Sequence, residues 1–140
     1  NMMKKYYLMA IEQKNSDAMY SMGIYYEDIE YNPELVIKYY KMAIELKNDR
    51  AMFGLGYFYH KKLNNYDEMK KYYLMAIENG DIDAINNLGY YYQHTEKNYD
   101  EMKKYYLMAI EKGNSCAMNG LGYYYRNIET NYEKMKKYYP

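Results

Sequence analysis

The chain has little of several things that would point to a function. It holds one cysteine in 140 residues, so no disulfide can form within it, and this cysteine does not identify the redox compartment. It contains no run of about 18 apolar residues, which argues against a membrane-spanning helix. Residues 1–12 lack the continuous apolar segment of a signal peptide and already belong to a pattern that recurs along the chain.

An excess of charge of one sign is also absent. The chain has 19 basic and 19 acidic residues, which gives a formal net charge of zero at pH 7. Proteins that bind the phosphate backbone of nucleic acids usually carry a basic excess on one face. We therefore expect neither nucleic acid nor a membrane as a partner, and the mean hydropathy of -0.83 indicates a surface that is polar throughout.

What the chain does have is a repeat of 33 residues without a single insertion. Tyr-Tyr pairs recur at 6–7, 39–40, 72–73, 105–106 and 138–139. Glycines keep the same step at Gly23, Gly56, Gly89 and Gly122. Self-similarity at a fixed period of 20–50 residues indicates an architecture of stacked repeats, in which each unit packs on its neighbours.

Each repeat predicts two helices. One begins after Asn32, Asn65, Asn98 or Asn131, and the other after Asn15, Asn48, Asp81 or Asn114. Asn and Asp are preferred at helix N-termini because their side chains accept a hydrogen bond from an otherwise unpaired backbone N–H. In the first type, apolar residues such as Met69, Tyr73 and Ala76 follow at helical spacing and predict a buried stripe.

The ends of these helices are also marked. Gly80 and Gly113 are candidate C-terminal caps, and Lys14 and Lys47 stand at the same place in the other copies. The recurring glycine in the middle of the second helix costs about 1 kcal/mol against alanine, so we expect a neighbouring helix to approach closely there.

The short connections leave room only for antiparallel helix pairs. We predict an all-α fold, a right-handed α-solenoid with a 33-residue period. It forms a single repeat array over 1–140, with a partial helix at 1–14 and units at about 15–47, 48–80, 81–113 and 114–140, the last truncated. The chain opens and closes within the same helix type, which favours a fragment of a longer array; a chain that stacks end to end is the alternative.

A family resemblance follows from the motif order. The block Ala117-Met118, Leu121-Gly122 and Tyr125, together with residues 98–114, resembles a Sel1-like repeat, a relative of the tetratricopeptide repeat. The resemblance covers all four copies and both partial ends. It departs from the family in lacking the usual Gly-x-Gly-Val loop between the two helices. The resemblance implies a helical repeat that works through interactions with other proteins.

Four positions of the second helix type differ between copies and lie at spacings of 3, 4 and 3, hence on one face. In the related tetratricopeptide family this face lines a concave groove that binds peptides, so the resemblance implies a set of partner-binding residues here. The set is Tyr20, Phe53, Tyr57, His60, Asn86, Tyr90, Gln93, Asn119, Tyr123 and Arg126. The alternative is neutral variation on an exposed face.

No constellation suggests chemistry. His60 and His94 fall in different registers without a partner at metal-ligand spacing, and Cys116 stands where other copies hold Asp or Arg. We predict no catalytic residues, no metal and no cofactor, hence no enzyme. The predicted function is a scaffold that binds a protein or peptide partner; the alternative is a structural array that self-associates end to end. The compartment stays open, with a cytoplasmic location favoured.

Overall fold

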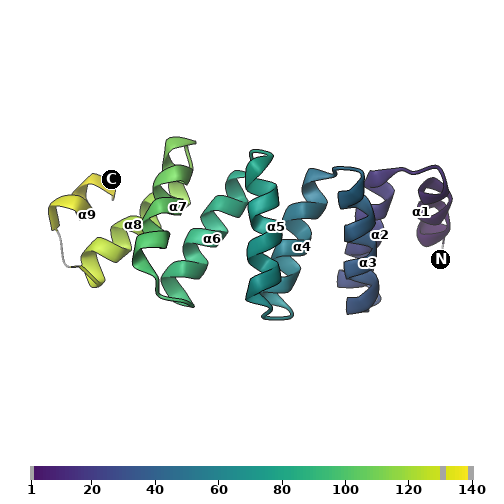
Figure 1. The fold of residues 1–140 in the computed structure, drawn as a ribbon, viewed down its shortest axis with the longest axis horizontal. Helices are drawn as coiled ribbons and strands as arrows, with labels where there is room; N and C mark the ends of the chain where they lie inside the picture. Colours follow the sequence, from purple (N-terminus) through teal and green to yellow (C-terminus); the bar gives the residue numbers. More distant parts are fainter. Residues whose placement is uncertain (1, 130–131, 139–140) are drawn as a thin grey trace. The chain divides into compact units, whose positions relative to one another are not determined.

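The structure is a computed structural model that describes residues 2–129 and 132–138. Within these residues all regular structure is helical (Figure 1). The helices are α1 (Met2–Glu12), α2 (Ser16–Asp28), α3 (Pro33–Glu45), α4 (Asp49–Lys61), α5 (Tyr66–Glu78), α6 (Ile82–His94), α7 (Tyr99–Glu111), α8 (Ser115–Asn127) and α9 (Tyr132–Tyr138). The prediction of an all-α fold is confirmed.

The predicted N-terminal caps are present from α2 to α8. Asn15, for example, accepts a hydrogen bond from the backbone N–H of Ala18 (3.1 Å), and Asn48 accepts one from that of Ala51 (3.0 Å). The equivalent side chains at the starts of the other five helices act in the same way. Asn131, the predicted cap of α9, lies outside the described residues. Each cap satisfies one backbone donor that the helix itself leaves unpaired.

The C-terminal ends follow the Schellman pattern at the predicted positions. After α3, the N–H of Lys47 bonds to the carbonyl of Ile44 (2.8 Å), and that of Asn48 bonds to the carbonyl of Ala43 (3.1 Å). This closure needs a positive φ at the residue after the cap, where Gly80 and Gly113 have 87° and 89° and Lys47 has 61°. Lys47 therefore holds a backbone conformation that residues other than glycine rarely adopt.

We expect Lys47→Gly to raise the free energy of unfolding by about 0.5–1 kcal/mol, because glycine adopts this φ without a steric penalty. The reverse change at the equivalent place, Gly113→Lys, is expected to lower it by a similar amount. Urea unfolding followed by circular dichroism measures both. A loss of stability in Lys47→Gly would contradict the strain argument.

The helices form two compact units. Unit 1 (Asn1–Asn79) holds α1 to α5, in which α2 pairs with α3, α4 pairs with α5, and α3 packs on α4. Unit 2 (Gly80–Pro140) holds α6 to α9, in which α6 pairs with α7, α8 pairs with α9, and α7 packs on α8. Within each unit, consecutive helices lie side by side in chain order, as the helical-hairpin prediction requires (Figure 1).

The mid-helix glycines make room for tyrosine rings. A Cβ atom on Gly23 would lie 2.4 Å from the Tyr40 ring, and one on Gly89 would lie 2.6 Å from the Tyr106 ring. The predicted close approach is thus confirmed, and the approaching group is the second tyrosine of each Tyr-Tyr pair. Gly122 shares the register, but the matching tyrosine at 139 lies outside the described residues.

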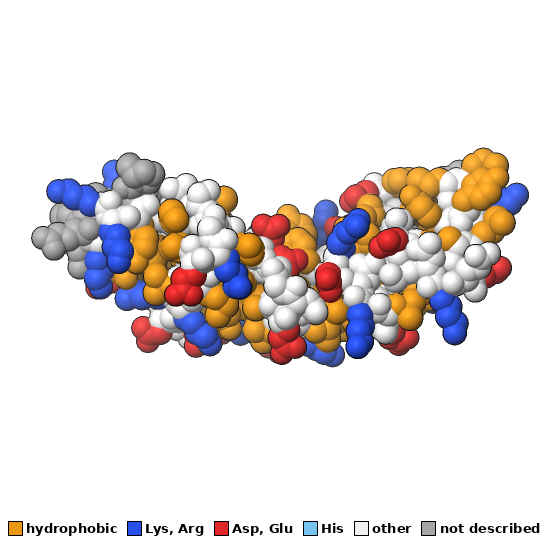
Figure 2. Space-filling model, turned by 90° about the horizontal axis from the view of Figure 1, so that it is seen from above, with side chains coloured by type: hydrophobic (Ala, Val, Ile, Leu, Met, Phe, Trp, Pro, Cys, Tyr) orange, Lys and Arg blue, Asp and Glu red, His pale blue; other side chains and the backbone are white. Residues whose placement is uncertain are grey.

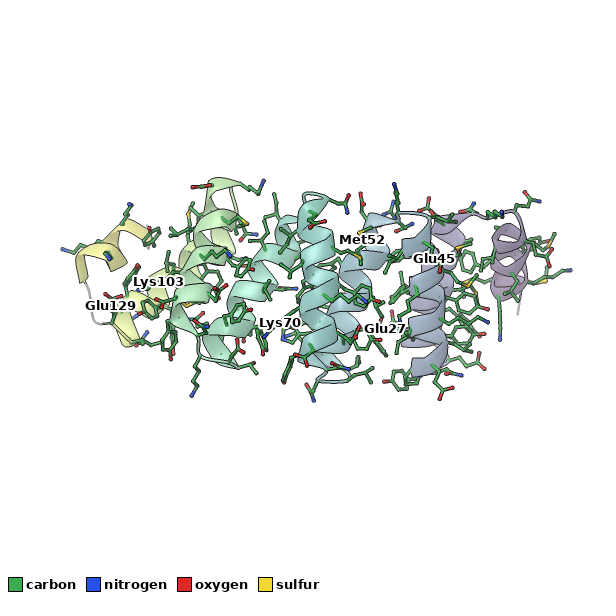
Figure 3. The ribbon with its side chains drawn as sticks, viewed as in Figure 1. Glu27, Glu45, Met52, Lys70, Lys103 and Glu129 are labelled. Carbon is green, nitrogen blue, oxygen red and sulfur yellow. The ribbon has the colours of Figure 1, made fainter. Side chains whose placement is uncertain are left out.

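A lysine links neighbouring helix pairs at the same register of both units. In unit 1 Lys4 of α1 lies 3.4 Å from Glu30, just beyond α2. In unit 2 Lys103 of α7 lies 3.3 Å from Glu129, just beyond α8 (Figure 3), and its ammonium is 4.8 Å from the Tyr124 ring centroid. These groups are partly exposed, so each pair contributes modestly to stability.

Candidate functional site

The buried tyrosine of each pair hydrogen-bonds to a residue 13 positions before it. Tyr40 donates to the Glu27 carboxylate (2.9 Å), whose place between the helices is labelled in Figure 3. Tyr106 donates to Oε1 of Gln93 (2.8 Å). In the copy between them, Nδ1 of His60 lies 3.2 Å from the Tyr73 hydroxyl oxygen. Three chemically different side chains therefore perform one structural task, because a buried hydroxyl needs a hydrogen-bonding partner.

Burial shifts the pKa values of this buried layer, which consists of the tyrosines and the side chains hydrogen-bonded to them. It raises the pKa of Tyr40, with the Glu27 charge adding to the effect, and it raises the pKa of Tyr106, with Tyr90 adding to the effect. It also raises the pKa of Glu27, against the hydrogen bond from Tyr40. Burial lowers the pKa of His60 to about 4, helped by the charge of Lys61. His60 is therefore neutral in the folded protein near pH 7.

Two residues of the predicted partner-binding set lie in this buried layer. His60 is 6% exposed and Gln93 is 4% exposed. A partner-binding residue has to be accessible, whereas these two side chains are buried and hydrogen-bond to Tyr73 and Tyr106. The signal was present in the sequence: Glu27, His60, Gln93 and Arg126 can all form hydrogen bonds, at a constant distance of 13 residues from a tyrosine.

Five of the ten predicted residues come together in unit 2. A hollow of about 510 Å³ lies over α6, α7 and α8. Its lining is Asn86, Tyr90, Gln93, His94, Tyr106, Cys116, Asn119, Gly120 and Tyr123. The predicted members are the two asparagines, the glutamine and the tyrosines at 90 and 123. The sequence did not indicate the part played by His94, Tyr106, Cys116 or Gly120, because it does not show which helices adjoin.

The floor of this hollow is a closed hydrogen-bond network. The Oε1 atom of Gln93 accepts from Tyr106, and its Nε2 donates to the carbonyl of Gly120 (3.4 Å). Both ends of the Gln93 amide are therefore used within unit 2. The exposed rings of the lining are those of Tyr90 (47%), Tyr123 (48%) and His94, and Asn86, Asn119 and Cys116 lie beside them.

The equivalent face of unit 1 is built differently. Tyr57 is 39% exposed and lies 5.9 Å from the ring of Phe53. The rings of Tyr20 and Phe53 stack on the buried tyrosines Tyr40 and Tyr73, each with centroids 5.8 Å apart. These two residues thus have a packing role beyond the one predicted for them. Arg126 in unit 2 is exposed but does not line the hollow.

Other classes of site find no support among the described residues. Basic and acidic side chains are interspersed over the middle of the face drawn in Figure 2, and basic ones are more numerous towards the end of the molecule that holds α9. Within residues 2–129 and 132–138, no three His, Cys, Asp or Glu side chains are arranged to hold a metal ion. No helix in the described part of the chain is both long and apolar enough to cross a bilayer.

Comparison with solved structures gives the fold class. A protective antigen of uropathogenic Escherichia coli strains, described as displaying an SLR fold, aligns over 86% of this chain with a TM-score of 0.73 and 24% identity. A Sel1 repeat protein from Oxalobacter formigenes aligns over 96% with a TM-score of 0.70 and 24% identity. The chain has the Sel1-like helical-repeat fold, which confirms the resemblance drawn from its motifs.

The likeness concerns the fold alone at this identity. The chain covers 28% of the length of the antigen and 60% of that of the Oxalobacter protein. An immunity protein from Pseudomonas aeruginosa is also similar, with a TM-score of 0.57 and 19% identity over 96% of this chain and 69% of its own. No protein-family model matches the sequence, and no curated protein matches it either.

Proposed function

We propose that the chain is an interaction scaffold that binds a segment of a protein partner on the faces of its capped second-type helices, which are α6 and α8 within unit 2 and α2 and α4 within unit 1. The observation that carries this proposal is the hollow of unit 2, which gathers residues from three helices around a volume typical of ligand sites. Helical-repeat folds of this kind commonly serve as binding surfaces.

The chemistry of the face supports a protein partner. Tyr57, Tyr90 and Tyr123 occupy one register and expose large aromatic side chains, which carry much of the binding energy in protein interfaces. Asn86 and Asn119 supply amides that suit the N–H and C=O groups of a peptide backbone. His60 and Gln93 are left out of the contact set, because they support the buried tyrosines.

We expect Tyr57→Ala and Tyr90→Ala each to weaken partner binding by about 10-fold or more, which equals about 1.4 kcal/mol, and to leave the helical circular-dichroism signal unchanged. The partner is obtained by pull-down with the chain, and affinities are measured by calorimetry. Lys71→Ala, an exposed change on another helix face, is the control. If the tyrosine variants lose helicity as well as binding, these residues support the fold and do not form the binding face.

Self-association is a second candidate function, favoured by α1. Tyr6 is 56% exposed, whereas its counterparts Tyr72 and Tyr105 are 4% and 7% exposed beneath their paired helices. A helix that covered α1, of another copy or of a longer chain, would bury this stripe, as α4 and α6 do for α5 and α7. Sedimentation velocity tests it: species that grow with concentration support self-association, and a monomer at all concentrations removes it.

A further inference from the structure

One register of the second-type helices carries a ring in unit 1 and none in unit 2. Tyr20 stacks on Tyr40 with an interplanar angle of 28°, and Phe53 stacks on Tyr73 with the same angle. The residue in the corresponding place above Tyr106 is Asn86, whose side chain is short and has no ring. The third copy therefore lacks an aromatic group that the first two copies provide themselves.

The hollow of unit 2 borders this register, because Asn86 is one of its lining residues. A Cβ atom on Gly54 in unit 1 would lie 3.4 Å from the Tyr40 ring and 3.6 Å from the Tyr20 ring, so Tyr20 fills the space beside this glycine. Gly120 holds the same register in unit 2, and the three nearest atoms to its Cβ position, at 2.8–2.9 Å, all belong to Tyr106. Gly120, Tyr106 and Asn86 all line the hollow.

His94 is the one lining residue of the hollow with a basic side chain. The lining contains no Asp, Glu, Lys or Arg side chain. A charged group brought there would lose its hydration without gaining a counter-charge, which is unfavourable. Tyr106 is 2% exposed, so a ligand would contact chiefly the exposed rings of Tyr90 and Tyr123 and the amides beside them.

We propose that this hollow binds an aromatic side chain, Phe, Tyr or Trp, of the partner segment, against the exposed rings of Tyr90 and Tyr123 and beside Asn86, which holds the register of Tyr20. The proposal rests on the proposed function of this face and specifies the residue that the partner contributes. A cavity of about 150 Å³ is enough for benzene, so about 510 Å³ holds a ring together with its peptide backbone. Rings also gain from stacked and edge-to-face contacts with neighbouring rings, which an aliphatic side chain does not make.

The test uses single-residue probes and the intact chain. N-acetyl amides of tyrosine, phenylalanine, leucine and glutamate are titrated while the side-chain amide signals of Asn86 and Asn119 are followed by NMR. We expect the two aromatic probes to bind in the millimolar range, at least about 5-fold more tightly than the leucine probe, and the glutamate probe not to bind. Equal affinity for leucine and phenylalanine would overturn the proposal.

Two variants at one position locate the binding. Asn86→Phe supplies the missing ring, as in the first two copies, so it is expected to weaken the aromatic probes at least about 10-fold and to raise the melting temperature. Asn86→Ala removes one amide contact but leaves the hollow open, so it is expected to weaken the aromatic probes less than Asn86→Phe does. If Asn86→Phe binds the aromatic probes as well as the unmodified chain does, the hollow is not an aromatic site. A lower melting temperature of this variant would mean that the added ring does not fit there, and would likewise contradict the proposal.

The outcome is separable from that of the proposed function. If the partner still binds and depends on Tyr90 while aromatic probes show no preference, the aromatic assignment fails and the scaffold proposal stands. If aromatic probes bind but no partner segment depends on this face, the scaffold proposal fails.

Discussion

Gly56→Ala is expected to lower the free energy of unfolding by about 2 kcal/mol, whereas Gly54→Ala, two residues earlier in the same helix, is expected to raise it by up to about 1 kcal/mol. Intrinsic helix propensity favours alanine at both positions by the same amount. The difference arises from the space beside each residue, because only one of the two glycines lies against a tyrosine that cannot move away.

The distances decide the sign. A Cβ atom on Gly56 would lie 2.6 Å from Cδ1 of Tyr73 and 3.2 Å from its backbone nitrogen. The ring is fully buried and the backbone belongs to α5, so relief requires the helices to separate, and overpacking of this kind costs about 3 kcal/mol. A Cβ atom on Gly54 would approach no closer than 3.4 Å, which is ordinary contact.

Urea unfolding of the two single variants beside the unmodified chain measures both effects, with the m-value checked for a change in cooperativity. Equal and favourable effects at Gly54 and Gly56 would mean that helices α4 and α5 do not meet through this contact.

As the pH drops from 6.5 to 4, we expect His60 to lower the free energy of unfolding by up to about 3 kcal/mol. His60→Gln is expected to abolish this contribution. The folded-state pKa of His60 is lowered from 6.5 to about 4, chiefly by burial. Between these values the unfolded chain binds a proton that the folded chain does not. The stabilisation that comes from the neutral, buried His60 is therefore complete above pH 6.5, decreases between pH 6.5 and 4, and is lost once the pH has fallen through about 4.

Glutamine is the matched replacement because Gln93 already performs this task for Tyr106. At pH 7 we expect His60→Gln to change stability by no more than about 1 kcal/mol, since the edge-to-face contacts of the imidazole with Tyr66 and Tyr73 are lost while the hydrogen bond is kept. The measurement is a series of urea-unfolding curves from pH 7.5 to 4. His94→Gln, an exposed change in unit 2, shows the effect of removing a histidine as such. Parallel pH curves for the unmodified chain and His60→Gln would contradict a buried, neutral His60.

Local structure could be predicted closely because it depends on neighbours in the sequence. An asparagine at a helix start bonds to an N–H three residues away, and the apolar spacing of residues such as Met69 and Ala76 fixes which side of a helix is buried. The mid-helix glycine also predicted a close contact, since its cost in a helix needs compensation. The candidate site was predicted in part: Asn86, Tyr90, Asn119 and Tyr123 line one hollow.

The error at His60 and Gln93 has a physical cause. Variation between copies does not require exposure, because a buried hydroxyl can pair with any of several hydrogen-bonding side chains, so the residue type can change while the contact stays.

The sequence by itself determined the repeat, the helix limits and the buried stripes, because these follow from a 33-residue period and contacts within four residues. Only the tertiary structure decided which ring lies against which glycine, that His60 and Gln93 support the core, and that Asn86, which holds the register of Tyr20 and Phe53, lines a hollow. These features join residues 13 to 34 positions apart, and their geometry depends on how the helices pack against one another.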